Sequence, residues 1–392
     1  MTNRHSERSN LSWSIDKIRG IRIPVCVMSA LLALLISGCG GGGSSSGGGS
    51  SNTEASDQSV SLRGIDSTFT ADPDYVYTYE QTKFVPPDDK VLLIIGQTKQ
   101  DIIDGYMNVV SSTPGGFASY WGLTTNMLGI IADSPDTGFG VQNAQELITT
   151  YENTVLQHAL WLVDNTTLCT LSTSGTYDSV IDNYINWVKS INIPVYLRIG
   201  YEFDGEHNAY DPVCYKDAYK WIVDRMRSGG VTNVAFVWHS SADTPYDNNS
   251  IDAWYPGDDY VDWVAVSVFL HFYPPTSAAR LQRLDDVIDF ARVHKKPVMI
   301  AESAPAGGIV ADSYETWDAW FVETFRYMYE KNIKAFSYIS ADFDSYDGFL
   351  SLGWGDARVE AFPLVREQFL LETSKTRYLK QSDTLFGELV FP

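Results

Sequence analysis

The sequence predicts an α/β fold in which residues 60–392 form a single domain, a (β/α)8 TIM barrel. Eight short apolar runs, rich in β-branched residues, alternate with segments whose apolar residues recur at helical spacing. The runs do not alternate polar with apolar residues, which is typical of parallel strands covered on both faces. Two of them end in a carboxylate, at Glu202 and Glu302. A buried carboxylate is costly unless it is paired or used, so both positions are candidates for a functional site.

The alternation assigns each element in chain order. Strands are expected at residues 91–96, 117–121, 159–163, 194–201, 233–238, 261–269, 297–301 and 334–339. Helices are expected at residues 144–151, 177–190, 215–227, 281–294, 314–330 and 359–371. Ser313 is placed to cap one helix, and Asp178 or Ser179 to cap another. Because no second linker and no internal repeat interrupts this region, one closed barrel accounts for it.

The N-terminal segment predicts export. Residues 1–22 are basic, residues 23–36 are apolar but too short to span a bilayer comfortably, and the run ends in Leu35-Ile-Ser-Gly-Cys39. This ending resembles the lipobox of bacterial lipoproteins, so residues 1–38 are expected to be a lipoprotein signal peptide and Cys39 to be lipidated. The Gly/Ser-rich residues 39–59 would then be a flexible tether. The alternative is an ordinary secretory signal that is cleaved nearby. The expected location is the bacterial cell envelope, at the outer membrane or cell surface.

The charge limits the partners. Removing residues 1–38 takes away five basic and two acidic side chains, so the net charge goes from −21 to −24. Nucleic acid and anionic membrane surfaces would be repelled, and the only expected membrane contact is the N-terminal lipid. The expected partner is a polysaccharide substrate, and a monomer is expected.

Cysteines and histidines give few signs of metal chemistry. Outside the N-terminal segment only Cys169 and Cys214 remain, and in an oxidising compartment such a pair predicts a disulfide, with two free thiols as the alternative. Both are expected in loops that follow consecutive strands. Six histidines without cysteine clusters make no zinc pattern. The segment 342–348 has a tyrosine where a calcium loop needs a ligand, and no glycine-rich loop has phosphate-binding spacing. No metal and no cofactor are expected.

The two strand-end glutamates predict a chemistry. In a (β/α)8 barrel, catalytic groups lie at the C-terminal ends of the strands. Two carboxyl groups roughly 5–5.5 Å apart can cleave a glycosidic bond with retention, one as a proton donor and one as a nucleophile. By the period of two along a strand, Arg198 shares a face with Gly200 and Glu202 and points into the barrel, where it would stabilise Glu302 or another acidic partner. The alternative for each glutamate is a solvated residue at the start of a loop.

Aromatic and polar residues near the same end are candidate sugar contacts. Sugar rings have apolar faces that stack on flat side chains, although each aromatic residue is also a candidate for the core. The candidate aromatic residues are Trp121, Tyr201, Trp238, Trp254, Tyr255, Phe269, Tyr273, Tyr338 and Trp354. The polar candidates are Gln97, Arg198, Asp204 and His239, of which His239 would bond a sugar hydroxyl or a carboxyl, or else be a buried structural histidine.

Four segments carry a family resemblance. The residues at 194–205 (PVYLRIGYEFDG), 234–240 (VAFVWHS), 254–267 (WYPGDDYVDWVAVS) and 294–303 (HKKPVMIAES) resemble glycoside hydrolase family 26, within the wider clan A of retaining (β/α)8 glycosidases. The resemblance extends from about residue 96 to residue 354. It implies that Glu202 is the acid/base and Glu302 the nucleophile. Tyr201 stands where mannanases of the family usually have histidine, which argues against mannan.

The expected function is therefore a retaining, endo-acting hydrolase of a β-linked polysaccharide. β-Mannan leads by its frequency in the family, followed by β-1,3-xylan and mixed-linkage β-glucan. The alternatives are a non-catalytic glycan-binding surface lipoprotein and a transglycosylase with the same residues. A glycan-binding protein would have no need of both strand-end carboxylates.

Overall fold

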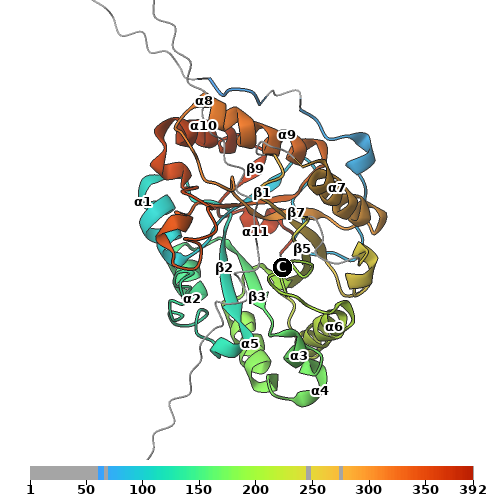
Figure 1. The fold of residues 1–392 in the computed structure, drawn as a ribbon. Coiled ribbons are helices and arrows are strands. Elements are labelled where there is room, and N and C mark those ends of the chain that lie inside the picture. The colour runs from blue at the N-terminus through green and yellow to red at the C-terminus, as the bar shows by residue number, and fades with distance from the viewer. Residues whose placement is uncertain (1–60, 66–68, 244–248, 273–276, 392) are drawn as a thin grey trace, which may run out of the picture. The chain divides into compact units, whose positions relative to one another are not determined.

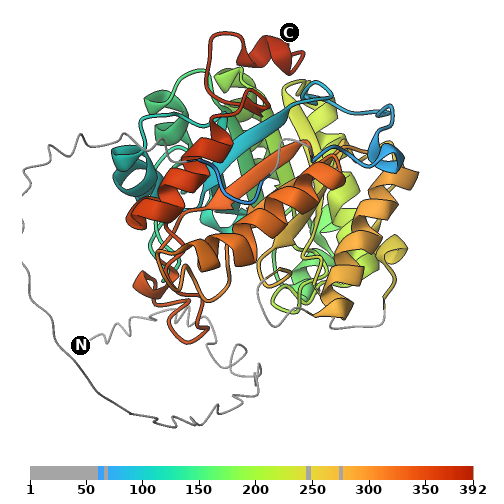
Figure 2. The same ribbon diagram turned by 90° about the horizontal axis from the view of Figure 1, so that it is seen from above.

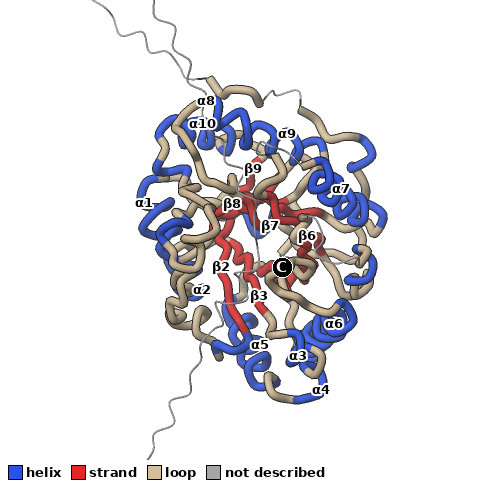
Figure 3. Tube along the Cα trace, viewed as in Figure 1, coloured by secondary structure: helices blue, strands red, loops and turns tan. Residues whose placement is uncertain are grey.

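The computed structural model describes residues 61–65, 69–243, 249–272 and 277–391. The expected signal peptide, Cys39, the tether and Tyr273 lie outside these residues. Eight parallel strands close into a barrel, and helices surround it (Figures 1 and 3). Closure occurs at β1, which pairs with β8 on one side and with β2 on the other. The predicted (β/α)8 barrel is confirmed.

The strands agree with those expected to within a few residues. The barrel strands are β1 (Val91–Gly96), β2 (Gly116–Gly122), β3 (Val155–Trp161), β4 (Val195–Ile199), β5 (Val234–Ser240), β6 (Trp263–Val268), β7 (Val298–Ser303) and β8 (Ala335–Ile339). The largest difference is β3, which begins four residues before the expected start at residue 159. Its apolar run continues to Leu162 and Val163, which are buried beyond the last paired residue, so hydrophobicity alone placed the strand too late. A short β9 (Tyr378–Leu379) pairs with the start of β1.

The helices follow the strands in order. They are α1 (Met107–Val109), α2 (Ala144–Thr150), α3 (Asn165–Leu168), α4 (Leu171–Ser174), α5 (Asp178–Ile191), α6 (Pro212–Ser228), α7 (Ala278–Val293), α8 (Tyr314–Thr316), α9 (Glu323–Glu330), α10 (Pro363–Thr373) and α11 (Leu385–Glu388). A π-helical stretch precedes α1 (Asp101–Tyr106) and another joins α8 to α9 (Trp317–Val322). None of the helices in the described part of the chain is long and apolar enough to cross a membrane.

The caps explain some boundaries and correct others. Ser313 caps α8 as expected, since its side chain accepts a hydrogen bond from the Thr316 amide. The expected cap of α5 is wrong, because Asp178 is already helical and Tyr177 makes no side-chain cap. Helix α6 begins three residues earlier than expected, where Asp211 caps it and Pro212 occupies its first turn.

Two apolar layers hold the barrel. The inner layer fills the barrel with side chains such as Ile94, Val237 and Met299, and Leu385 and Leu389 of the C-terminal segment pack into it. Figure 2 shows the C-terminal helix, in red, over one end of the barrel. The outer layer packs the strands against the helices. Because the C-terminal segment covers the end where the strands begin, the opposite end is left for function.

A disulfide joins Cys169 and Cys214, as predicted. Their expected position in loops is only partly right. Cys169 ends the short helix α3, whereas Cys214 lies in the first turn of α6. The bond therefore ties the segment after β3 to the helix after β4.

Candidate active site

Glu302 lies at the C-terminal end of β7 and reaches the barrel interior through a β-bulge. Ile300 pairs with Val266 and Glu302 pairs with Ser267, so Ala301 is an extra residue between them. A bulge re-aims the side chain that follows it. Gln157, inside the barrel on β3, donates a hydrogen bond of 2.7 Å to the Ala301 carbonyl. Ala301 faces the barrel interior. Because side chains alternate along a regular strand, Glu302 would point to the outer face if the bulge were absent.

Glu202 is carried by a turn beyond β4 rather than by the strand itself. The strand ends at Ile199, Gly200 has a φ of +58° and Glu202 a φ of +51°. Both values lie in the left-handed region, which is costly for a glutamate and is typical of functional sites. Glu202 lies at the end of the barrel that the sequence predicted. The expected alternation of side chains from Arg198 to Glu202 does not explain its position, because the strand ends before Gly200.

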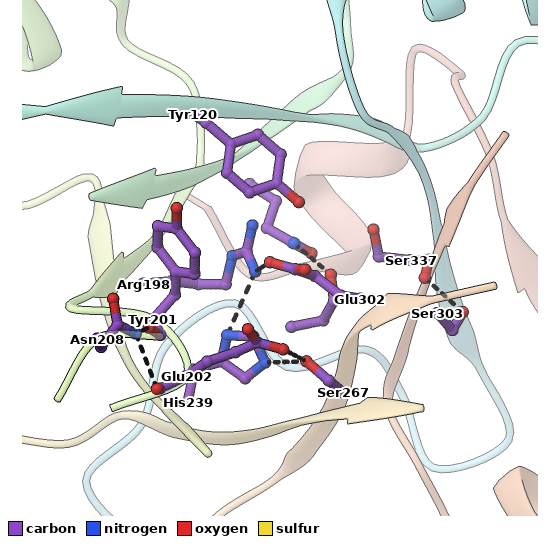
Figure 4. A network of polar contacts seen from close by, with 12 residues as sticks. Tyr120, Arg198, Tyr201, Glu202, Asn208, His239, Ser267, Glu302, Ser303 and Ser337 are labelled. Carbon is purple, nitrogen blue, oxygen red and sulfur yellow. Dashed lines mark hydrogen bonds and ion pairs between the residues drawn. The ribbon is translucent and has the colours of Figure 1, made fainter. Parts of the chain in front are cut away.

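Arg198 points into the barrel and pairs with Glu302, as expected. The Arg198 side chain is completely buried, and its Nη1 donates a hydrogen bond to Glu302 Oε1 (Figure 4). Burial raises the pKa of the Glu302 carboxyl, the Arg198 charge opposes that effect, and the net change is upward. A buried cation needs an anionic partner, and Glu302 is the carboxylate that Arg198 contacts. Arg198 thus supplies a fixed positive charge beside Glu302, and, because its side chain is completely buried, the expectation that it contacts a sugar is wrong.

A chain of polar contacts runs from Arg198 to Glu202 (Figure 4). Arg198 Nη1 lies 3.2 Å from His239 Nδ1, and His239 Nε2 lies 3.0 Å from Ser267 Oγ. The Ser267 hydroxyl donates to Glu202 Oε1 over 2.6 Å. Burial and the Arg198 charge hold the pKa of His239 well below its usual range, so its ring is neutral. His239 therefore lies beneath the site as a buried histidine and does not face a sugar.

Glu202 has a titratable neighbour instead of a fixed cation. His207 Nε2 lies 3.2 Å from Glu202 Oε2, and the His207 side chain is 52% exposed against 14% for Glu202. Burial raises the pKa of Glu202, but the contacts with His207, His239 and Ser267 lower it to about 2. The pKa of His207 is correspondingly raised by Glu202. This pair can hold a proton either on the carboxyl or on the imidazole, whereas Arg198 is a permanent cation.

Aromatic rings line the same end of the barrel. Arg198 lies over the Tyr120 and Tyr201 rings, 5.1 and 5.5 Å from their centroids. Tyr201 is partly exposed, as are Gln97 after β1 and Trp161 at the end of β3. In the loop after β8, the partly exposed Trp354 packs edge-on against Phe269, with ring centroids 4.7 Å apart. Gln97, Tyr201, Phe269 and Trp354 are all partly exposed and stay predicted sugar contacts.

Several other expected sugar contacts belong to the core, and those expectations are wrong. Trp238 stacks on Phe203, and Trp254 packs against the same ring, at centroid distances of 4.6 and 5.4 Å. Tyr338 donates to the Ala357 carbonyl. Trp121 and Tyr255 likewise pack under the helices. Strand-end position was a poor guide because the strand residues among them point outward toward the helices, away from the barrel interior.

Asp204 is a structural residue, contrary to expectation. It is buried and forms an ion pair of 2.8 Å with Arg283 of α7. It also accepts hydrogen bonds from the Ser240 hydroxyl and the Ser241 amide, at 2.6 and 2.7 Å. These contacts fix the turn after Glu202 to β5 and α7, and they leave no carboxylate oxygen free for a sugar.

Four residues of this end of the barrel were not predicted from the sequence: His207, Ser267, Tyr120 and Trp161. The alternation along β2, β3 and β6 could have found the last three, since each shares a face with inward residues earlier on its strand. His207 had no such signal, because it lies in an irregular loop whose path depends on tertiary contacts. Among the residues that the structure describes, no group of histidine, cysteine, aspartate and glutamate side chains could hold a metal ion.

The fold and the site define a class of protein: a (β/α)8 barrel with a buried carboxylate and a protonatable carboxylate at the C-terminal ends of its strands, as in retaining glycosidases. The family model of glycosyl hydrolase family 26 matches residues 163–346. A β-1,3-xylanase of Vibrio sp is 30% identical over 334 residues, which cover 77% of this chain and 69% of the relative. A β-1,3-xylanase of Alcaligenes sp is 29% identical over 331 residues, covering 77% and 67%.

Solved structures show the same fold. A β-mannanase of Bacteroides ovatus superimposes with a TM-score of 0.53 at 14% identity, covering 75% of this chain and 91% of that one. An endo-β-1,4-mannanase of Cellulomonas fimi gives a TM-score of 0.52 at 14% identity, covering 80% of each chain. At such identities the likeness concerns the fold alone. The sequence relatives decide the family: the chain belongs to glycosyl hydrolase family 26, and it is a retaining, endo-acting glycoside hydrolase.

Proposed function

We propose that Glu302 is the nucleophile and Glu202 the acid/base of this hydrolase. The observation that carries the assignment is the different partner of each glutamate. Glu302 contacts the buried Arg198 guanidinium, whereas Glu202 contacts the titratable His207. A nucleophile must be ionised and a proton donor must be able to hold a proton. The surroundings of the two carboxyl groups meet these opposite needs.

The reaction proceeds in two displacements. Glu202 gives its proton to the glycosidic oxygen while the Glu302 carboxylate attacks the anomeric carbon, which forms a covalent glycosyl–enzyme intermediate. Glu202, now ionised, takes a proton from water, and that water displaces Glu302. Two inversions at one carbon retain its configuration. Arg198 positions Glu302 and balances its charge in the free enzyme.

The proposed substrate is β-1,3-xylan. The two relatives that align over 77% of this chain are both named β-1,3-xylanases. The mannanase structures share the fold at 14% identity, which carries no argument about substrate. Tyr201, in place of the histidine usual in mannanases of the family, also argues against mannan. Tyr201, Trp354 and Gln97 would contact the sugar chain, since they lie partly exposed at the same end of the barrel.

The test combines a polymer panel with two variants. The purified protein should release reducing ends from β-1,3-xylan, and not from β-1,4-mannan, β-1,4-xylan or mixed-linkage β-glucan. Glu302→Ala and Glu202→Ala should each lose at least about 100-fold in kcat on the polymer. With an activated aryl glycoside and added azide, Glu202→Ala should form the β-glycosyl azide. Glu302→Ala should form the α-glycosyl azide, because azide then takes the place of the missing nucleophile.

Glu206→Gln is the matched control, because Glu206 is an exposed glutamate on the same loop. It should cleave the polymer at close to the wild-type rate. Azide products of the opposite configurations would reverse the two roles. Tight polymer binding without cleavage would favour the glycan-capture alternative, and transfer of the glycosyl group to sugar in preference to water would favour a transglycosylase.

We also propose that the protein is a lipid-anchored monomer of the bacterial cell envelope, on the strength of the lipobox-like ending at Cys39 and the Gly/Ser-rich residues after it. Cells that produce the full chain should carry it in the membrane fraction, and Cys39→Ser should move it to the soluble fraction. An unchanged distribution of the variant would contradict lipidation at Cys39. Light scattering of the detergent-solubilised protein would test the expected monomer.

A further inference from the structure

The hydrogen-bond directions around Glu202 decide which of its oxygens can carry a proton. An arginine can only donate, so His239 Nδ1 accepts from Arg198 and the His239 proton lies on Nε2. His239 Nε2 then donates to Ser267 Oγ, and the Ser267 hydroxyl proton is free to point at Glu202 Oε1. Because Oε1 accepts this hydrogen bond of 2.6 Å, a proton on Glu202 belongs on Oε2.

Oε2 is the oxygen that faces His207. The separation of 3.2 Å between His207 Nε2 and Glu202 Oε2 is within hydrogen-bonding range. Asn208 Nδ2 also approaches Nε2, at 3.1 Å, but its two hydrogens are directed to the Tyr201 and Glu202 carbonyls, at 2.8 and 2.9 Å. The Glu202 carboxyl is therefore the hydrogen-bonding partner left for His207 Nε2.

The backbone makes room for this contact at Gly205. A Cβ on Gly205 would lie 2.5 Å from His207 Cε1 and 2.8 Å from His207 Nδ1. The imidazole thus rests against the glycine, and only the absence of a side chain there lets the ring reach Glu202. Asn208 holds the same turn through the two carbonyls that it bonds.

We propose that His207 is a positioning residue that shares one proton with Glu202, between Nε2 and Oε2, and exchanges that proton with solvent. When the Oε2–H bond breaks and an Nε2–H bond forms, the pair changes from a neutral acid and neutral imidazole to a carboxylate and an imidazolium. Its net charge stays the same. Before the first displacement, the proton returns from His207 Nε2 to Glu202, which gives it to the leaving oxygen. In the second displacement Glu202 takes a proton from water, so His207 consumes no proton in a turnover. This inference rests on the proposed role of Glu202.

The pKa of His207 also depends on the other charged groups around it. Burial lowers the pKa of His207, while the Glu202, Glu302 and Asp204 carboxylates raise it, and the net change is upward. The neutral His239 is linked to the other carboxylate oxygen of Glu202 through Ser267. A histidine with a raised pKa keeps its proton until the pH rises above its ordinary value of about 6.5. The pair consequently keeps its proton at a pH where a lone carboxyl of ordinary pKa, about 4.3, would have lost it.

The first measurement follows the proton directly and needs no substrate. In ¹⁵N-labelled protein, the imidazole nitrogens report the pKa of each histidine, and the His207 signal is identified by its loss in His207→Gln. The pKa of His207 should lie above its ordinary value in the wild type and fall in Glu202→Gln, which removes the facing charge. An equal pKa of His207 in both proteins would overturn the proposal.

The second measurement is the pH profile of kcat/KM on the cleaved polymer. His207→Gln, which keeps a donor but does not titrate, should move the alkaline limb to lower pH, with about tenfold less activity than wild type at pH 8 and within about twofold at pH 5. Gly205→Ala, which displaces the ring, should move the limb in the same direction. An unmoved limb in His207→Gln would overturn the catalytic part of the proposal.

His294→Gln is the matched control. His294 Nδ1 forms a similar contact of 2.7 Å with Asp258 Oδ1, but at the end of α7, where the chain enters β7 at the opposite end of the barrel. Its pH profile should match that of the wild type. If no polymer is cleaved at all, the proposed function fails, while the nitrogen titrations still decide whether His207 and Glu202 share a proton.

Discussion

Individual residues of one type have different roles here because their surroundings differ. Glu202 and Glu302 both end buried strands in the sequence, yet one faces a histidine and the other an arginine. Trp254 and Trp354 both have Gly, Asp or Pro nearby in the sequence, yet Trp254 ends a short 3-10 helix and is completely buried, whereas Trp354 is partly exposed. Residue type and local composition identified the candidates, but the role of each depended on contacts with residues far away in the chain.

Trp254→Ala is predicted to destabilise the protein rather than to weaken polymer binding alone. The side chain is completely buried against Phe203 and Tyr215, so its removal leaves a cavity and should lower the free energy of unfolding by about 3–5 kcal/mol. Chemical denaturation would measure the loss. The control is Trp221→Ala on α6, where the side chain is only partly buried and the cost should be smaller. Equal stability of Trp254→Ala and wild type would return Trp254 to the sugar-binding candidates.

At the scale of elements, two local irregularities place the glutamates. The bulge at Ala301 turns Glu302 into the barrel, and the left-handed turn from Gly200 to Glu202 carries the second carboxyl over its mouth. The sequence predicted both strands and their ends. It could not predict the bulge, because an extra residue in a strand is defined by its pairing with β6, which no local pattern in β7 records.

Gly200→Ala is predicted to disturb the turn that carries Glu202. Besides the positive φ, a Cβ at this position would lie 2.8 Å from both Leu162 Cδ1 and Tyr215 Cε2. The variant should lose about 2 kcal/mol or more of stability and also lose kcat, because Glu202 would move. The control is Gly175→Ala, which has a φ of +68° but no atom within 4 Å of the added Cβ, and it should cost only about 1 kcal/mol and no activity. Equal losses of stability and of kcat in the two variants would show that crowding around a Cβ at position 200 does not contribute to the effect.

At the scale of the whole molecule, the closed barrel leaves one end for chemistry. The C-terminal residues Leu385 and Leu389 fill the end where the strands begin. The polar chain from Glu302 to Glu202 crosses the opposite end and draws on β4, β5, β6 and β7. The sequence did not predict the covering role of the C-terminal segment, because a helix as short as α11 has no periodicity to recognise.

The sequence by itself determined the barrel, the order of its strands, the two strands whose C-terminal ends lead to the glutamates, the inward direction of Arg198 and the family. These follow from hydrophobic periodicity and short motifs, which are local properties of the chain. Only the tertiary structure decided that Arg198 pairs with Glu302, that His207 faces Glu202, and that Trp238, Trp254 and Tyr338 belong to the core. The physical reason is that pairing, burial and the pKa of a carboxyl depend on which distant residues the fold brings within a few ångströms.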